Sequence, residues 1–147
     1  MSNYATLVDV LIQNEMKGIN NHERIVELGM TPDILIQECG FPGLPLGIKA
    51  STISKICFDH GIATSVIQRL PEILQFPKSI YASANSNQSD SVVVFTFEVK
   101  GQLPIIIPIR KNQSAGRKRY NFVTSMYGKE GNDPEIRWKR LLIWEQS

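Results

Sequence analysis

Cysteine and histidine are scarce in this chain of 147 residues, which contains two of each. Cys39 and Cys57 form no Cys-x-x-Cys pair, and no histidines cluster near them, so the pattern does not predict a zinc site. We expect two free, largely buried thiols. Asp, Glu and His also form no cluster with the spacing of metal ligands. The sequence therefore predicts a protein that works without a metal ion or another cofactor.

Long apolar runs are also missing. No stretch approaches the roughly 18 to 20 apolar residues that a membrane helix needs. Residues 1–20 lack the basic start, apolar middle and small-residue cleavage site of a signal peptide. We expect a protein that does not contact membranes and acts in the cytoplasm. A protein secreted or delivered into a target cell by another apparatus would have the same pattern.

The composition is that of an ordinary globular protein, with 42% apolar and 20% charged residues. The net charge of +2 hides an asymmetry. Residues 1–99 hold six Lys and Arg against ten Asp and Glu, whereas residues 100–147 hold ten against four. The final third therefore carries a concentrated positive charge, which favours binding of a polyanion. A solvated basic surface without a partner is the alternative.

The first half of the chain has helical periodicity. Apolar residues recur at helical spacing over residues 4–17 and again over 25–30. Residues 31–40 add a third predicted helix, with Thr31 as N-cap, Pro32 at the first helical position, Asp33 in the first turn and Gly40 after the end. After a connector rich in proline and glycine, in which residues 46–49 favour a short strand, two more helices are predicted. They cover residues 51–60, ending at Gly61, and residues 64–76, with a break near Pro71.

From residue 78 the period changes from helical to alternating, which indicates strands. Polar and basic residues 113–119 separate the third strand from the fourth and predict a loop, and a loop with a short helix precedes the last strand. The predicted strands cover residues 78–83, 91–100, 103–111, 120–129 and 141–144. A chain whose helices come first and whose antiparallel strands come second has an α+β arrangement. We divide the chain into a helical N-terminal subdomain, residues 1–40, and an α+β domain, residues 41–147.

The order of these segments resembles a known family. It runs from "SKICFDHGI" through "LPEILQFPKSIYAS" and "PIIIPIRK" to "FVTSMYGK" and "LLIW". This series resembles the C-terminal toxin domain of phage MuF-type proteins, in the superfamily of barnase, EndoU, colicin and RelE-like ribonucleases. The resemblance covers about residues 44–146. It implies helices packed on a four- or five-stranded antiparallel sheet that binds RNA on its concave face.

The function that this resemblance implies is that of a metal-independent ribonuclease toxin or effector, with tRNA among the candidate substrates. The family's histidine would be His60, and its hydroxyl-bearing strand would carry Thr124 and Ser125. No strand glutamate occupies the obvious place of the general base in barnase. A toxin also implies a cognate immunity or antitoxin protein as partner.

Cleavage of RNA without a metal ion needs a proton acceptor, a proton donor and cations or donors around the phosphate. His60 can act as acid or base near neutral pH because imidazole titrates there. Alternation along residues 122–127 directs Phe122, Thr124 and Met126 inward and leaves Ser125 and Tyr127 on the open face. The predicted catalytic residues are His60, Arg110, Thr124, Ser125 and Tyr127.

A second set of residues is predicted to bind RNA. Arg110 and Lys111 end an apolar strand, where a guanidinium that leaves the sheet can bind phosphate through two hydrogen bonds. Tyr127 and Lys129 could stack a base and hold its phosphate. The predicted RNA-binding residues are Lys55, Ser83, Lys111, Arg117, Lys118, Arg119 and Lys129. The competing hypothesis is a module that binds RNA or an acidic protein without any chemistry, and each of these residues could also be an ordinary surface or strand residue.

Overall fold

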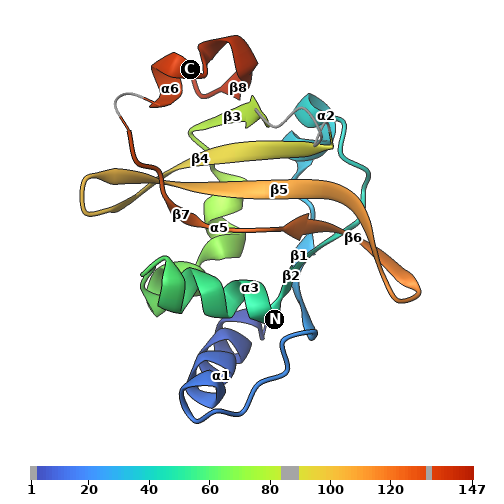
Figure 1. The fold of residues 1–147 in the computed structure, drawn as a ribbon. Helices are drawn as coiled ribbons and strands as arrows, with labels where there is room; N and C mark the ends of the chain where they lie inside the picture. The colour runs from blue at the N-terminus through green and yellow to red at the C-terminus, as the bar shows by residue number, and fades with distance from the viewer. Residues whose placement is uncertain (1–2, 84–89, 132–133) are drawn as a thin grey trace.

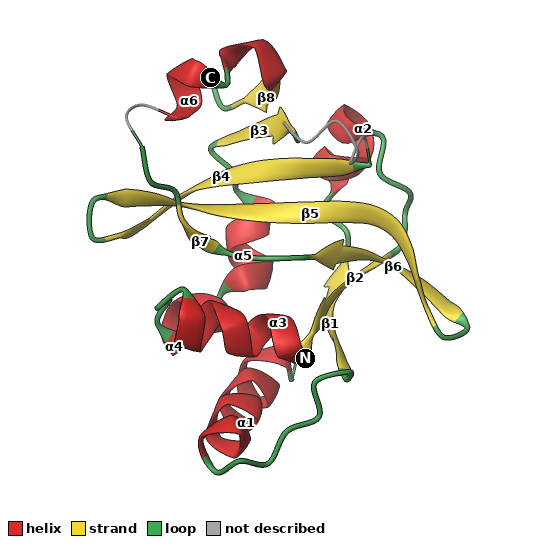
Figure 2. Cartoon of the chain, viewed as in Figure 1, coloured by secondary structure: helices red, strands yellow, loops and turns green. Residues whose placement is uncertain are grey.

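The computed structural model covers residues 1–147 and describes residues 3–83, 90–131 and 134–147 (Figure 1). Its largest element is one twisted sheet. Helices gather on one side of this sheet, and a short helical segment lies beyond its far edge (Figure 2). Within the described ranges, no helix has both the length and the apolar character that crossing a membrane requires. The fold is a mixed α+β fold.

The sheet contains eight strands among the residues described. Seven lie in the order β1-β2-β6-β5-β4-β3-β8, and β7 pairs with β5 beyond the end of β6. The pair β2 and β6 is parallel and the other pairs are antiparallel. The expected four- or five-stranded antiparallel sheet is therefore wrong in size and in direction. The strands are β1 (Ile25–Met30), β2 (Pro45–Lys49), β3 (Ser79–Ala82), β4 (Ser91–Lys100), β5 (Leu103–Ala115), β6 (Lys118–Val123), β7 (Tyr127–Gly128) and β8 (Leu142–Glu145).

The helices match most of the predicted segments. A π-helical turn, η1, continues α3, and a break at Arg69 separates α4 from α5 near Pro71, as expected. Gly40 ends α2 in the left-handed conformation, also as expected. The helical elements are α1 (Tyr4–Met16), α2 (Asp33–Cys39), α3 (Ala50–Ser54), η1 (Lys55–Asp59), α4 (Thr64–Gln68), α5 (Leu70–Gln75), α6 (Pro134–Arg137) and the 3-10 turn η2 (Lys139–Leu141).

Residues 25–30 form a strand, so the predicted helix there is wrong. Val26 and Leu28 are buried, whereas Glu27 between them is exposed. This alternation is also the pattern of a half-buried strand, and a short apolar segment does not distinguish the two periods. Pairing with β2 decides the conformation, because β2 offers a partner for backbone hydrogen bonds along this segment.

Thr31 does not cap α2 with its side chain, which corrects a second prediction. The N-cap position is Pro32, and no side chain caps the helix. The Thr31 hydroxyl instead donates to the carbonyl oxygen of Leu44, at 2.6 Å. It also accepts a hydrogen bond from the side-chain amide of Asn121, at 2.7 Å. Thr31 therefore joins the start of α2 to a connector and to β6.

The main core lies between the helices and one face of the sheet. It runs from Tyr4 and Val8 in α1 to Val123 and Met126 near the end of the sheet. A second, smaller core on the other face contains Tyr81, Phe95 and Ile106, and residues of the C-terminal segment pack against it. Residues on both sides of position 40 share the main core, and the domain boundary placed there stays a prediction.

The hairpin of β5 and β6 replaces most of the predicted basic loop. β5 continues to Ala115, and Lys118 and Arg119 already belong to β6. Only Gly116 and Arg117 form the turn, and Gly116 has φ of +64°. A two-residue turn with glycine allows strands to continue to its edges, even where their side chains are polar and exposed.

Candidate functional site

The strand that was predicted over residues 120–129 is interrupted in its middle. Val123 pairs with Ile109 of β5, and Tyr127 pairs with Ile106. Four steps along β6 and β7 therefore correspond to three steps along β5, so one extra residue lies in the segment 124–126. An extra residue of this kind changes the faces to which the following side chains point.

This irregularity corrects the expected orientation of the hydroxyl residues. Met126 is fully buried and joins Val123 in the main core, whereas Thr124 is exposed. Thr124 was expected to point inward by strict alternation, and this is wrong. Ser125 and Tyr127 are half-buried. The interruption thus presents the Thr124 side chain to solvent while the strand stays anchored by Val123 and Met126.

His60 comes directly after the π-helical turn η1. Its backbone N–H donates to the carbonyl oxygen of Lys55, at 2.9 Å, and Gly61 follows with φ of +65°. The half-buried His60 ring lies 5.5 Å from the ring of Tyr127, centroid to centroid, with a tilt of 39°. This contact brings together two of the residues that were predicted to be catalytic.

A groove of about 360 Å³ surrounds this pair, and we call it the His60 groove. Lys100, at the end of β4, donates from its Nζ atom to the carbonyl oxygen of His60, at 2.7 Å. This bond ties the hairpin of β4 and β5 to the end of η1. The lining residues of the His60 groove are Asp59, His60, Lys100, Leu103, Tyr127, Gly128, Lys129 and Glu130.

The charges of the His60 groove are mixed. Lys100 and Lys129 provide two cations, and Asp59 and Glu130 provide two carboxylates. The Lys129 ammonium lies over the ring of Trp138, 5.0 Å from its centroid, which holds the side chain by a cation–π contact. The groove therefore combines side chains of the types that can accept or donate a proton with cations that can bind an anion.

Tyr127 connects the His60 groove to the smaller core. Its side chain packs against the cluster of Tyr81, Phe95 and Ile106. Burial raises the pKa of the Tyr127 hydroxyl above its usual value, because burial disfavours the phenolate. The hydroxyl is therefore neutral at physiological pH and can donate a hydrogen bond.

A second groove of about 300 Å³ contains the predicted residues Arg110 and Thr124, and we call it the Arg110 groove. The Nε atom of Arg110 donates to Asp90, at 3.1 Å, which fixes the guanidinium beside β5. The Thr124 hydroxyl donates to the carbonyl oxygen of Pro108, at 3.3 Å. The lining residues of the Arg110 groove are Lys49, Thr52, Arg110, Gln113, Ser114, Phe122, Val123 and Thr124.

The two grooves lie at opposite ends of one seam between α3–η1 and β6–β7. Thr52, near the start of α3, lines the Arg110 groove, and His60, after η1, lines the His60 groove. On the strand side, Tyr127 pairs with Ile106 of β5, four residues before Arg110. At about 3.3 Å per residue, this places the two grooves roughly 13 Å apart along β5. The structure thus groups His60 with Tyr127 and Lys129, and Arg110 with Thr124.

The family model described as phage MuF-C-terminal domain matches residues 54–146. The chain belongs to this family. No curated protein and no solved structure matches the chain. All residues that line the His60 groove lie inside the matched segment of this MuF C-terminal domain, whereas Lys49 and Thr52 of the Arg110 groove precede it.

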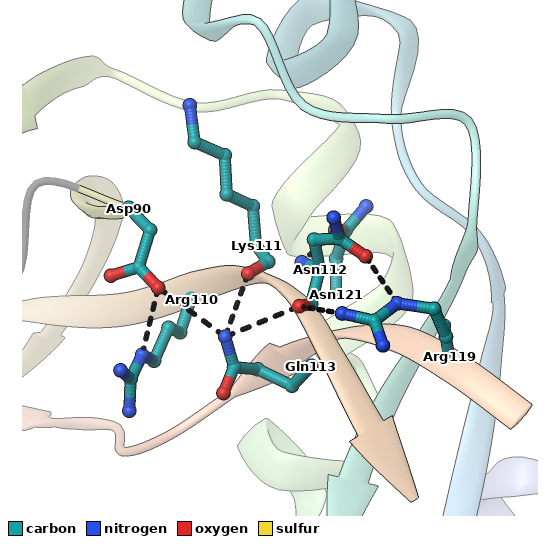
Figure 3. A network of polar contacts seen from close by, with 7 residues as sticks. All are labelled: Asp90, Arg110, Lys111, Asn112, Gln113, Arg119 and Asn121. Atoms are coloured by element: carbon teal, nitrogen blue, oxygen red, sulfur yellow. Dashed lines mark hydrogen bonds and ion pairs between the residues drawn. The ribbon is translucent and has the colours of Figure 1, made fainter.

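A polar network in the MuF C-terminal domain holds the strand beside Arg110 in place (Figure 3). Asn112 has φ of +58° and creates an irregularity in β5. Its backbone N–H donates to the side-chain oxygen of Asn121, at 2.9 Å, and its own side-chain oxygen accepts from Arg119, at 2.6 Å. Arg119, predicted to bind RNA, therefore already makes a structural contact. Gln113 also donates to Asp90, at 3.3 Å, so that Asp90 joins Gln113 to Arg110.

The remaining predicted RNA-binding residues are spread over the MuF C-terminal domain. Lys55 lines a different groove, together with Phe58 and His22. The Lys111 ammonium lies 5.8 Å from the centroid of the Phe41 ring. Arg117 is exposed in the β5–β6 turn, and Lys118 forms an exposed ion pair with Glu27, at 3.8 Å. Ser83 follows β3, and its N–H donates to Ser91, which pairs with Arg110.

Sequence reasoning missed seven polar residues that line the two grooves of this MuF C-terminal domain: Lys49, Thr52, Asp59, Lys100, Gln113, Ser114 and Glu130. Asp59 and Glu130 are adjacent in sequence to the predicted residues His60 and Lys129, and this adjacency was the available signal. Lys100 carried no signal of this kind, because a hairpin brings it to His60 from another part of the chain.

Proposed function

We propose that this MuF C-terminal domain is a metal-independent ribonuclease toxin of the barnase, EndoU, colicin and RelE-like superfamily. The observation that carries the proposal is the contact between His60 and Tyr127 in a groove that also contains Lys100 and Lys129. An imidazole, a phenol and two ammonium groups are the parts that cleavage of a phosphodiester without metal needs.

The reaction begins when a base removes the proton from the ribose 2′-OH. The 2′-oxygen then attacks the neighbouring phosphorus, and the bond from phosphorus to the 5′-oxygen breaks. An acid gives its proton to the departing 5′-oxygen, which becomes a 5′-OH end. The other product carries a 2′,3′-cyclic phosphate. His60 performs one of the two proton transfers in this proposal, because imidazole can accept or donate a proton near neutral pH.

The second proton transfer falls to a carboxylate of the same groove. Asp59 and Glu130 both line the His60 groove. If either acts as the base, His60 in its protonated form acts as the acid. Asp59→Asn and Glu130→Gln keep the size of each side chain and remove its ability to accept a proton. The variant whose loss of kcat matches that of His60→Ala identifies the base.

The remaining groups of the His60 groove stabilise the phosphate as its charge increases. Lys100 and Lys129 supply positive charge, and the neutral Tyr127 hydroxyl supplies a hydrogen bond. Ser125 precedes Tyr127 by two residues and is half-buried, and it remains a predicted donor. Arg110 and Thr124 also remain predicted phosphate contacts, from the neighbouring Arg110 groove.

A toxic ribonuclease has consequences for its producer. The producing cell needs an immunity or antitoxin protein, and an acidic surface on that partner would complement the basic final third of this chain. We propose that the toxin acts on cytoplasmic RNA, after delivery or release into that compartment.

The test is incubation of the purified chain with total RNA in EDTA, followed by analysis of the new RNA ends. We expect cleavage that leaves 2′,3′-cyclic phosphate and 5′-OH ends. His60→Ala should lower the rate by about 10²- to 10⁴-fold, the usual contribution of a proton-transfer group. His22→Ala is the matched control, because His22 is the other histidine and lines different pockets, where it pairs with Glu15 at 3.2 Å.

Two results would contradict the proposal that this protein is a ribonuclease. Full activity of His60→Ala would exclude the proposed site. Binding of RNA that weakens steeply with salt, without cleavage under any condition, would support the alternative of a binding module.

A further inference from the structure

We propose that the Arg110 groove binds a second phosphate of the RNA strand, two nucleotides away from the phosphate that is cut in the His60 groove. This inference rests on the proposed function. It predicts that Lys49 and Thr52 contact the substrate, although both lie outside the matched family segment. It also predicts that the substrate must extend beyond the scissile phosphate.

The lining of the Arg110 groove suits an anion. Lys49 and Arg110 supply two cations, and Thr52 and Ser114 supply hydroxyl groups that can donate to phosphate oxygens. Among the described residues that line this groove, none is Asp or Glu. The His60 groove, in contrast, has two carboxylates for its two lysines. The lining of the Arg110 groove therefore suits binding of an anion, whereas the lining of the His60 groove suits proton transfer.

Arg110 is held in a conformation that leaves donors for a ligand. Its Nε atom donates to Asp90, which also accepts from Gln113 (Figure 3). Within residues 3–83, 90–131 and 134–147, no hydrogen-bond partner is found for the two Nη groups of Arg110. These groups can bind a phosphate through two parallel hydrogen bonds, the geometry that favours arginine over lysine at such sites.

The separation of the grooves requires two different phosphates. Along α3 and η1, Thr52 and His60 are eight residues apart, or about 12 Å at about 1.5 Å per residue. Along β5 the separation is about 13 Å by the strand spacing. These two independent measures agree, and either exceeds the reach of one phosphate group. Consecutive phosphates of one strand lie closer together than this, so a single strand that follows the seam would place phosphates two nucleotides apart in the two grooves.

The experiment compares two substrates and a small set of variants. A dinucleoside monophosphate contains only the scissile phosphate, whereas a hexanucleotide also offers neighbouring phosphates. Lys49→Ala, Arg110→Gln and their combination remove cations from the Arg110 groove. Lys17→Ala is the matched control, because Lys17 is an exposed cation that lines neither groove.

We expect the wild-type protein to cleave the hexanucleotide with a kcat/KM at least tenfold above that of the dinucleoside monophosphate. The double variant should lower the ratio of the two kcat/KM values by about tenfold, and Lys17→Ala should leave it unchanged. An equal fall on both substrates would overturn the inference, because Arg110 and Lys49 would then act at the scissile phosphate itself. Lys49→Ala keeps the test valid if Arg110→Gln fails to fold, because Lys49 is exposed.

A binding measurement separates this inference from the proposed function. Fluorescence anisotropy of a labelled hexanucleotide with the His60→Ala protein gives affinity as a function of salt. Each lost phosphate contact should lower the slope of log K against log salt by about 0.7 for a single strand. If adding Lys49→Ala and Arg110→Gln to the His60→Ala protein leaves this slope unchanged, the proposed subsite is rejected. If the wild-type protein cleaves neither substrate but the slope falls as expected, the ribonuclease proposal fails and the phosphate site stands.

Discussion

The ring of His60 lies 5.5 Å from the ring of Tyr127, centroid to centroid, and this contact joins a helical element to an edge of the sheet. His60 follows the π-helical turn η1, and Tyr127 begins β7. Neither residue is in the main core, but Tyr127 directly follows the buried Met126, and His60 lies between the buried residues Ile56 and Ile62. The rings therefore meet because buried neighbours such as Ile56 and Met126 fix both backbones.

Two substitutions of Tyr127 should separate a structural role of its ring from a chemical role of its hydroxyl. Tyr127→Phe keeps the ring contact with His60 and should change the free energy of unfolding by less than about 1 kcal/mol, while kcat falls about tenfold with the lost hydrogen bond. Tyr127→Ala should also destabilise the protein, by about 2 kcal/mol, because it removes packing against the smaller core. Urea unfolding and RNA cleavage measure the two effects. Full activity of Tyr127→Phe would contradict a role for the hydroxyl.

Lys100 should support activity much more than stability. Its ammonium donates to the carbonyl oxygen of His60 from an exposed position. Lys100→Ala should lower kcat/KM about tenfold, because it removes a cation from the groove and a restraint on His60. The thermal midpoint should change by no more than a few degrees, since exposed polar contacts contribute little to folding. Lys100→Arg keeps the charge and should recover part of the activity. Equal activities of Lys100→Ala and the wild-type protein would exclude this role.

Asn121 should be the most sensitive polar residue in the fold. It is completely buried, and its amide group donates to Thr31 and to the carbonyl oxygen of Pro42. Its oxygen accepts from the backbone of Asn112. Asn121→Ala leaves these partners without their bonds and should destabilise the protein by about 3 kcal/mol, measured by urea unfolding. Asn20→Ala, at an exposed amide, is the control, and a similar cost for both variants would contradict this prediction.

Gly47 should not tolerate a methyl group. An added Cβ would lie 3.1 Å from a ring carbon of Tyr120 and 3.2 Å from a ring carbon of Phe122, closer than ordinary packing allows. Gly47→Ala should therefore destabilise the protein by about 1–3 kcal/mol, as overpacking of a core does. At Gly43 an added Cβ meets nothing within 4 Å, so Gly43→Ala is the control. Thermal unfolding compares them, and equal midpoints would show that the rings move aside.

Cys39 should be unreactive in the folded protein. Burial, together with Glu38, raises the pKa of its thiol to about 11. At pH 8 the thiolate fraction is then about 200-fold below that of an ordinary thiol with pKa near 8.5. Because the fold favours the protonated thiol, this group contributes stability below about pH 8.5 and loses it as the pH rises towards 11. Alkylation with iodoacetamide, followed by peptide mass analysis, should show slow modification in buffer and fast modification in denaturant. Fast modification in buffer would contradict the prediction.

Local signals in the sequence predicted most of the secondary structure. Helix α1, the end of α2 at Gly40 and the break between α4 and α5 follow from periodicity, glycine and proline, which act over a few residues. The positive charge of residues 100–147 and the position of His60 before a glycine are also properties of the sequence itself. These features were predictable because their causes lie within one or two turns of chain.

The tertiary structure alone decided which of these residues meet. Pairing with β2 made residues 25–30 a strand, and the parallel pair of β2 and β6 enlarged the sheet. One extra residue between Val123 and Tyr127 exposed Thr124, and the seam beside it separated Arg110 from His60. Strand partners, register and the position of a helix on a sheet edge depend on contacts between distant segments, so no local pattern in the sequence encodes them.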